Sequence, residues 1–355
     1  MIKKILIFVV LLIALVVGTG YWFIGLIGEM PDLKAMESTQ PSSVAYLQRK
    51  VDTGRGNILI VVTSATEMGE SGKKTGYELT ELSRAYYVFS VNGFEVDIAS
   101  PKGGEPSAII DDEDMTIYDF AFLNDVEAQQ KVKHTIKTAD VQAGNYAAVY
   151  FVGGKGAMFD FPQDEAIQAF TASIYEAGGT VSAVCHGPAA LVNVQLSDGS
   201  YLIANKQVSS FTNEEELFLI PDAEVIFPFL LEDKLRERQG VFVGGTAYLQ
   251  QVSKDERLLT GQNPWSVWKV AEDVIRSMGY EPVQRDKTST EFSIDVLKTY
   301  EQFGFETART QLQQFHADPG KPIDKVIIGM HSILAVMNVE PLKALDLALL
   351  LQSIQ

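Results

Sequence analysis

The chain has 355 residues, of which 46% are hydrophobic and 21% charged, and it contains a single cysteine. This composition is typical of a globular protein and excludes a disordered chain, an intramolecular disulfide framework and a cysteine-rich metal site. The formal net charge is −17. An acidic surface repels phosphate backbones, so we expect no nucleic-acid partner.

The first apolar segment, residues 5–28, follows Lys3 and Lys4 and carries no charge. It is long enough to cross a hydrocarbon core of about 30 Å as a helix, and no Ala-x-Ala cleavage site follows it. We therefore predict an uncleaved transmembrane signal anchor over residues 1–28, in preference to a cleaved signal. The lysines place the N-terminus in the cytoplasm, which predicts a single-pass cell-membrane protein with an extracytoplasmic (periplasmic or extracellular) main domain.

Residues 29–55 contain prolines, serines and glycines with little apolar periodicity, so we predict a linker. The pattern then alternates: strands are predicted at 57–63, 94–99, 146–152 and 180–184, and helices at 77–91, 163–177 and from about Ala189. This order predicts an α/β domain over residues 56–282. Its sheet is doubly wound and mostly parallel, with helices on both faces, as in flavodoxin-like folds. A site in such a sheet lies at the carboxyl ends of the strands.

The single cysteine follows one of these strands, in the sequence Ala183-Val184-Cys185-His186-Gly187. Small residues two positions before and after a nucleophile are typical of a nucleophile elbow, a sharp turn that exposes the nucleophile at a helix start. The dipole and free N–H groups of that helix favour a thiolate. A buried structural cysteine is the alternative. The glycine turn 153–156 ends another predicted strand at the same edge of the sheet.

With these residues the chain resembles the ThiJ/PfpI family of the class I glutamine amidotransferase-like superfamily. Its stress chaperone and glyoxalase III branch is the most similar part. The resemblance covers residues 56–280 and rests on five segments that occur in the family's order. These are TGYELTELSRAYYVFSVNGFEVDIASPKGG (75–104), VYFVGGKGAMFDFP (149–162), GGTVSAVCHGPAAL (178–191), VSSFTNEEE (208–216) and LLTGQNPWSVWKVAEDVI (258–275).

The resemblance implies a catalytic set of Glu81, Cys185 and His186. It places Glu81 on the first helix of the domain, within reach of the cysteine sulfur. The backbone N–H groups of Gly154 and His186 would be the oxyanion donors. Without the resemblance, Glu81 would be interpreted as a solvated helix residue.

Two further positions are candidates for lining or orienting the site. Glu215 is the residue we assign to orient the histidine, although Glu214 and Glu216 are equally available from the sequence. Many relatives carry a histidine in the glycine turn, where this chain has Lys155. The lysine would either lower the pKa of the thiol further or indicate a changed substrate or reaction.

Several other chemistries are excluded or weakly supported. The four histidines form no downstream His-x-Glu motif, and there is no synthetase domain, so we reject glutamine amidotransferase activity. The glycine turn lacks the spacing of a phosphate-binding loop. We predict no metal site, because the acidic run 111–114 lacks the spacing and glycine of an EF-hand loop, which leaves only loose calcium binding as an alternative.

Residues 283–355 lie outside the resemblance and predict an all-helical C-terminal extension. Helical spacing is present over 292–315, 323–337 and 342–354. The preferred interpretation is a helical cap or a homodimer contact. The alternatives are a module that docks a partner and a lid over the site.

Together with the predicted anchor, the resemblance implies a membrane-anchored, cysteine-dependent enzyme that converts a small 2-oxoaldehyde, such as methylglyoxal, to a hydroxy acid, or performs a related deglycation. Such a glyoxalase III-like lyase or hydrolase needs neither glutathione nor another cofactor, because the redox change is internal to the carbonyl substrate. The alternatives are a membrane-tethered chaperone or partner-binding module without turnover, and a PfpI-like peptidase.

Overall fold

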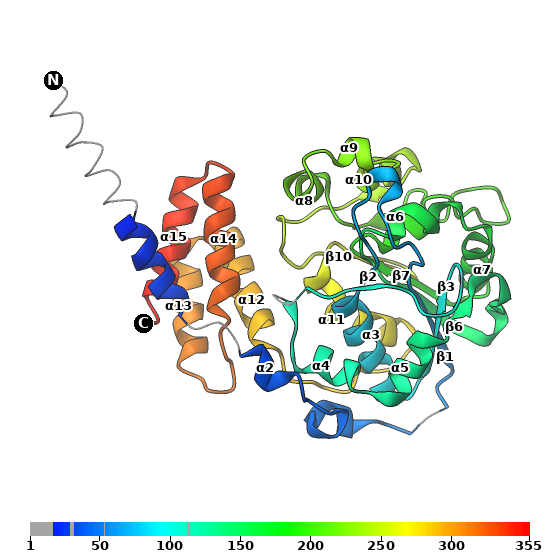
Figure 1. Ribbon diagram of the computed structural model, residues 1–355, viewed down its shortest axis with the longest axis horizontal. Helices are drawn as coiled ribbons and strands as arrows, with labels where there is room; N and C mark the ends of the chain where they lie inside the picture. Colours follow the sequence, from blue (N-terminus) through cyan, green and yellow to red (C-terminus); the bar gives the residue numbers. More distant parts are fainter. Residues whose placement is uncertain (1–16, 29–31, 53, 112–113) are drawn as a thin grey trace. The chain divides into compact units, whose positions relative to one another are not determined.

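The computed structural model describes residues 17–28, 32–52, 54–111 and 114–355. These residues divide into two compact units (Figure 1). The larger unit spans residues 33–285, and the smaller unit combines the residues up to Asp32 with residues 286–355.

A seven-stranded sheet with the order β10-β11-β7-β6-β1-β3-β5 forms the centre of the larger unit (Figure 1). Every neighbouring pair is parallel except β10 and β11, so the predicted α/β fold with a mostly parallel sheet is confirmed. The strands are β1 (Asn57–Val61), β3 (Glu95–Ser100), β5 (Ile136–Lys137), β6 (Tyr146–Phe151), β7 (Thr180–Val184), β10 (Val252–Asp255) and β11 (Leu258–Gly261).

Helices cover both faces of this sheet, as predicted. Successive side chains of a strand point to opposite faces of the sheet. In β1, Ile58 and Ile60 therefore pack into the core on one face, and Leu59 and Val61 pack into the core on the other. The first core is covered by α3 (Leu79–Val91), α4 (Ile117–Leu123), α5 (Val126–Lys133) and α11 (Val267–Ser277). The second is covered by α6 (Ala157–Asp160), α7 (Glu165–Glu176) and α10 (Leu231–Glu237).

Shorter elements complete the larger unit. Two strand pairs lie outside the main sheet: β2 (Tyr77–Glu78) with β4 (Ala108–Ile109), and β8 (Gln207–Val208) with β9 (Val241–Phe242). Two helices follow β8, namely α8 (Asn213–Leu219) and α9 (Ala223–Ile226). Single 3₁₀ turns occur at η3 (Gly69–Ser71), η5 (Thr138–Asp140), η6 (Ala143–Asn145), η7 (Phe161–Gln163), η8 (Gly187–Leu191) and η9 (Pro264–Ser266).

The segment after the predicted elbow differs from the sequence-based expectation. In place of an α-helix from about Ala189, the chain forms the 3₁₀ turn η8. The reason is local: a tight hairpin begins directly afterwards, where Gln195 bridges to Tyr201 and Leu196 N donates to Ser200 O at 2.9 Å. No length of chain remains in which an α-helix could continue.

Part of the segment predicted as a linker is folded onto the larger unit. Residues 33–49 form α2 (Leu33–Met36), η1 (Pro41–Ser43) and η2 (Ala45–Arg49). Val44 and Tyr46 are each 3% exposed and join the core beneath α3. Their burial ties the start of the larger unit to the helix that carries Glu81.

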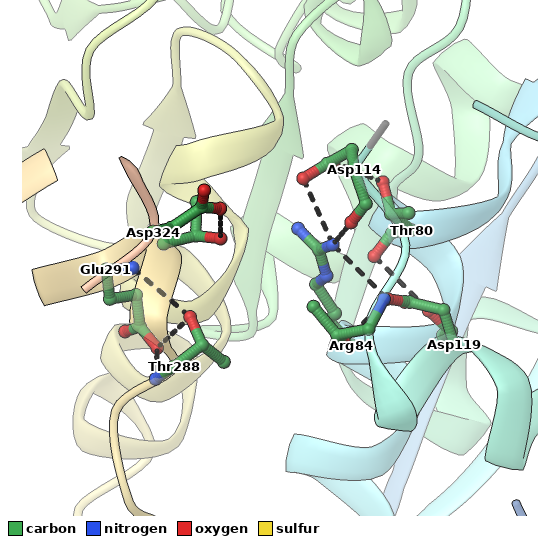
Figure 2. Close-up of polar contacts among 10 residues, drawn as sticks. Thr80, Arg84, Asp114, Asp119, Thr288, Glu291 and Asp324 are labelled. Atoms are coloured by element: carbon green, nitrogen blue, oxygen red, sulfur yellow. Dashed lines mark hydrogen bonds and ion pairs between the residues drawn. The ribbon is translucent and has the colours of Figure 1, made fainter. Parts of the chain in front are cut away.

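The smaller unit consists of apolar helices, as predicted for the C-terminal extension. They are α12 (Ser289–Phe303), α13 (Phe305–His316), α14 (Lys325–Met337) and α15 (Pro341–Gln352). The single helix predicted over 292–315 is broken at Gly304, whose φ of +79° interrupts the helical backbone. Thr288 and Glu291 form a reciprocal capping box that starts α12 (Figure 2).

The predicted transmembrane helix requires a correction. Within the ranges that the structure describes, no helix is both long and apolar enough to cross a bilayer, which overturns the predicted anchor and single-pass membrane localisation. Residues 1–16 of the predicted span lie outside the described ranges. Part of this segment packs within its own unit: Leu26 is 4% exposed, and Gln355 Nε2 donates to its carbonyl oxygen at 2.9 Å.

Candidate active site

Cys185 lies in a strained turn at the carboxyl end of β7, in the middle of the sheet. Its φ of +58° is in the left-handed region, which non-glycine residues rarely adopt. Two residues later, a Cβ on Gly187 would lie 2.3 Å from the carbonyl oxygen of Phe151, so only glycine fits there. The structure therefore places Cys185 in the tight turn that the small flanking residues predict.

His186 connects the thiol to a carboxylate. Its Nδ1 lies 3.3 Å from Cys185 Sγ, and its Nε2 lies 2.6 Å from Glu216 Oε2. An ionised carboxylate can only accept, so Nε2 carries the hydrogen and the lone pair of Nδ1 faces the thiol. The ring of Phe211, 4.8 Å from the imidazole, covers one side. The three side chains can therefore pass a proton from sulfur to nitrogen, with Glu216 stabilising the imidazolium.

Glu216, rather than Glu215, contacts the histidine. Glu215 is fully buried and occupied elsewhere: its Oε2 accepts from Thr212 N and Oγ1, both at 3.0 Å. Its Oε1 accepts from Tyr248 N at 2.7 Å and from Asn263 Nδ2 at 3.0 Å. Glu215 is the third residue of α8 and the carboxylate partner of Thr212 in the capping box that starts this helix. The next residue, Glu216, points in a different direction around the helix and faces His186.

Glu216→Gln is expected to lower kcat by about 10²- to 10⁴-fold while leaving the melting temperature almost unchanged, because the amide misorients the imidazole without opening a cavity. Glu215→Gln is the matched control. It removes an acceptor from a fully bonded buried carboxylate, so we expect it mainly to lower the free energy of unfolding, by about 1–3 kcal/mol. Steady-state kinetics and thermal melts of both variants test the assignment, and the reverse pattern would contradict it.

Glu81 is fully buried in the first turn of α3. Its Oε2 accepts from Gly153 N at 2.7 Å, its Oε1 has no hydrogen-bond partner among the described residues, and the Cys185 thiol is among the groups that influence its pKa. Burial raises the pKa of Glu81 to about 8, while the Gly153 amide partly opposes the increase. At neutral pH the carboxyl is therefore largely protonated and can act as a proton donor.

The thiol of Cys185 is less acidic than the elbow pattern suggests. Burial is the main cause that raises its pKa well above the ordinary value, and the charges of Glu81 and Glu215 act in the same direction. The Gly154 amide opposes them as a backbone hydrogen-bond donor to the thiol. Because η8 is a short 3₁₀ turn, it does not supply the helix dipole expected from the sequence. At neutral pH the site therefore holds Cys185 as a thiol rather than a thiolate.

The glycine turn after β6 lies against the side chains of Glu81 and Cys185. Gly154 has a φ of +91°, and its amide lowers the pKa of the thiol, while its role as an oxyanion donor stays a prediction. Lys155 is half-buried, and its charge acts on Glu78. Glu78 was not among the predicted site residues, although it lies only three residues before Glu81 in the sequence. Burial, with the charge of Glu81 adding, raises the pKa of Glu78 to about 9.

Gly153→Ala is expected to abolish most activity and to destabilise the fold by about 1–3 kcal/mol, because the new methyl group overpacks the site. Its Cβ would lie 2.6 Å from Glu81 Oε2 and 2.8 Å from Cys185 Cβ. Gly144→Ala is the matched control, since a Cβ at Gly144 meets no atom within 4 Å. Thermal melts and turnover of the two variants should differ sharply, and equal behaviour would refute the close approach.

The part of the chain that the structure describes holds no group of three or more His, Cys, Asp or Glu side chains arranged to bind a metal ion. Within the acidic run considered for calcium, residues 112–113 lie outside the described ranges. Asp114 is bound to Arg84 and Thr80 instead.

Comparison with known proteins identifies relatives of this chain. Residues 73–277 match the model of the DJ-1/PfpI family. Glyoxalase 3 of Candida albicans is 31% identical over 235 residues, covering 61% of this chain and 96% of the relative.

Two solved structures resemble the larger unit. The crystal structure of glyoxalase III from Candida albicans has a TM-score of 0.57 and 28% identity, covering 63% of this chain and 98% of that one. The Rapid Encystment Protein of 24 kDa from Francisella tularensis has a TM-score of 0.60 and 34% identity, covering 63% of this chain and 100% of that one.

Proposed function

Because the chain belongs to the DJ-1/PfpI family, we propose that the Cys185 site converts a small 2-oxoaldehyde, such as methylglyoxal, to the corresponding 2-hydroxy acid without glutathione. The observation that carries the proposal is the clustering of the buried Glu81, Cys185 and His186 side chains, with His186 Nδ1 3.3 Å from the sulfur of Cys185. It places a nucleophile, a base and a protonated carboxyl around one point. These are the groups that an internal hydrogen transfer between two adjacent carbons requires.

In the first step, His186 Nδ1 takes the proton of the thiol, and sulfur attacks the aldehyde carbon. The aldehyde oxygen gains the electron pair of its π bond and receives the proton of Glu81, which gives a hemithioacetal and leaves Glu81 ionised. The amide of Gly154 holds this oxygen while charge develops on it.

In the second step, the Glu81 carboxylate removes the hydrogen from the former aldehyde carbon. The electron pair forms a carbon–carbon double bond, and the ketone oxygen takes the negative charge and then the proton on His186. Glu81 returns its proton to the second carbon as the first oxygen loses its own to His186, which leaves a thioester. A carboxyl with a raised pKa is a stronger base for this step than an ordinary glutamate.

In the last step, a water molecule adds to the thioester carbonyl as it loses a proton to the ionised Glu81 carboxylate, and the proton held by His186 goes to the departing sulfur. The thiol is thereby restored, and the hydroxy acid is released. The aldehyde carbon has been oxidised and the ketone carbon reduced within one molecule, so no external oxidant or reductant is consumed.

The proposal is tested by incubating the purified chain with methylglyoxal in the absence of any added thiol and quantifying lactate. We expect one lactate per methylglyoxal consumed. Loss of methylglyoxal without lactate, at a rate proportional to total lysine and arginine, would show simple glycation and overturn the proposal. A panel that includes glyoxal and phenylglyoxal defines the size of carbonyl that the site accepts.

A further inference from the structure

A buried arginine lies one turn after Glu81 on α3 and links this helix to the segment before α4 (Figure 2). The side chain of Arg84 is 4% exposed, and its Nη2 lies 3.2 Å from Asp114 Oδ1 and 3.2 Å from Asp119 Oδ2. The same nitrogen donates to the carbonyl oxygen of Asp114. One cation is thus shared between two carboxylates in a site with almost no access to water.

The two aspartates hold the turn of α3 that contains Glu81. Thr80 Oγ1 donates to Asp114 Oδ2 at 3.0 Å, and the hydroxyl of Ser83 donates to Asp119. Asp119 also accepts from Thr116 N and Oγ1, both at 2.8 Å, in the capping box of α4. Glu81 therefore lies between two residues of α3, Thr80 and Ser83, that are fixed to the same neighbouring segment.

The charges of this network act on the catalytic carboxyl in opposite directions. Arg84 lowers the pKa of Glu81 and Asp114 raises it, in addition to the larger effect of burial. Four other ionisable or donor groups lie near Glu81. These are Glu78 before α3, Tyr150 on β6, the Gly153 amide after β6 and Cys185 after β7.

We propose that Arg84 and Asp114 are positioning residues that hold Glu81 against Cys185 and set its protonation state through their opposite charges. Arg84 alone would favour an ionised Glu81, which repels a thiolate. Asp114, bonded to Arg84, offsets that charge, so Glu81 remains able to give up its proton and to take one back. The effect on turnover rests on the proposed function, whereas the titration of Glu81 does not.

The alternative is that the network has a purely structural role and only holds α3 and α4 together. That role predicts equal losses of stability and kcat for any substitution, with no change in titration. Opposite shifts of the Glu81 titration on removing the two opposite charges would not arise from a purely structural role.

The test measures the titration of Glu81 directly, as the carboxyl C=O band in infrared spectra of the full chain that is absent from Glu81→Gln. Asp114→Asn is expected to lower the midpoint by about one pH unit, and Arg84→Gln to raise it by about as much. Asparagine keeps the shape of Asp114, accepting from Arg84 and donating to Thr80. Arg84→Lys, which retains the charge, should leave the midpoint nearly unchanged.

Asp119→Asn is the matched control. Asp119 contacts the same arginine as Asp114, but its carboxylate is not among the strongest influences on the pKa of Glu81. We expect lower stability with an unshifted midpoint. If Arg84→Gln fails to fold, the contrast between Asp114→Asn and Asp119→Asn still decides. Shifts in the same direction for Asp114→Asn and Arg84→Gln, or no shift for Asp114→Asn, would overturn the proposal.

If the chain turns over methylglyoxal, the basic limb of the kcat/KM profile should move with the infrared midpoint. Absence of turnover with shifted midpoints would contradict the proposed function alone.

Discussion

Cys185→Ala is expected to lower kcat/KM for methylglyoxal by on the order of 10⁴-fold or more, because no covalent intermediate can form without the thiol. Steady-state kinetics of the full chain with lactate detection measure this loss. No other cysteine can substitute, since the sequence contains one. Cys185→Ser keeps the size of the side chain but replaces the sulfur with a much weaker nucleophile, so it should be almost as inactive.

The inactive variants must be shown to fold. Truncation of a 6% exposed thiol to a methyl group removes little buried surface, so the free energy of unfolding should change by about 1 kcal/mol or less. Retention of more than a tenth of the wild-type activity in a folded Cys185→Ala chain would show that the reaction does not pass through sulfur.

Glu81→Gln is expected to lower kcat by about 10²- to 10⁴-fold, because the amide can hydrogen-bond but cannot carry a proton between the two carbons. The pH profile provides a second signature. With a pKa of about 8, Glu81 loses its proton as the pH rises through that value, so kcat/KM of the wild type should fall there. The residual activity of Glu81→Gln should lack this limb. The exposed Glu95 is the matched control, and Glu95→Gln should behave as the wild type.

The proton on Glu81 also makes the stability of the fold depend on pH. The pKa of Glu81 is higher in the folded than in the unfolded chain, so the folded state binds this proton more tightly. The resulting stability is fully present below about pH 4.5 and is lost as the pH rises through about 8.

Denaturant unfolding at several pH values measures this linkage. The free energy of unfolding of the wild type, relative to Glu81→Gln, should fall across that window. A constant difference between the two chains would show that Glu81 is not protonated in the folded state.

The sequence contained enough information to predict the sheet and the tight turn that holds Cys185. Continuous apolar runs such as 57–61 and 180–184 indicate strands that are buried on both faces, and the structure places them at β1 and β7. Small residues around Cys185 predict the tight turn because larger ones cannot fit against β6. Both signals are local, and local signals are those that a single sequence expresses most clearly.

Features that depend on tertiary context were predicted less well. Three consecutive glutamates, residues 214–216, are chemically equivalent in sequence, and only the start of α8 at Asn213 decides which of them faces His186. The raised pKa of Glu81 depends on burial beneath segments far away in the chain. The partnership of Arg84 with Asp114 joins residues 30 positions apart and has no sequence signature.

The N-terminal segment shows the limit of hydropathy. An apolar run has the same composition whether it spans a bilayer or packs against protein. In the smaller unit, a Cβ added to Gly329 of α14 would lie 2.8 Å from Ile27 Cδ1, so this glycine permits a close approach of the N-terminal segment. Leu26, one residue earlier, is buried. Neither contact can be inferred from the spacing of apolar residues alone.

The covalent role of Cys185 is the central claim, and rapid acid quenching followed by peptide mass spectrometry tests it most directly. Mixing the full chain with methylglyoxal should yield a peptide containing Cys185 that carries the mass of one substrate molecule. This species should accumulate in Glu81→Gln, where the attack proceeds but the hydrogen transfer does not. Lactate formation with no modified Cys185 peptide at any quench time, in either chain, would contradict the account.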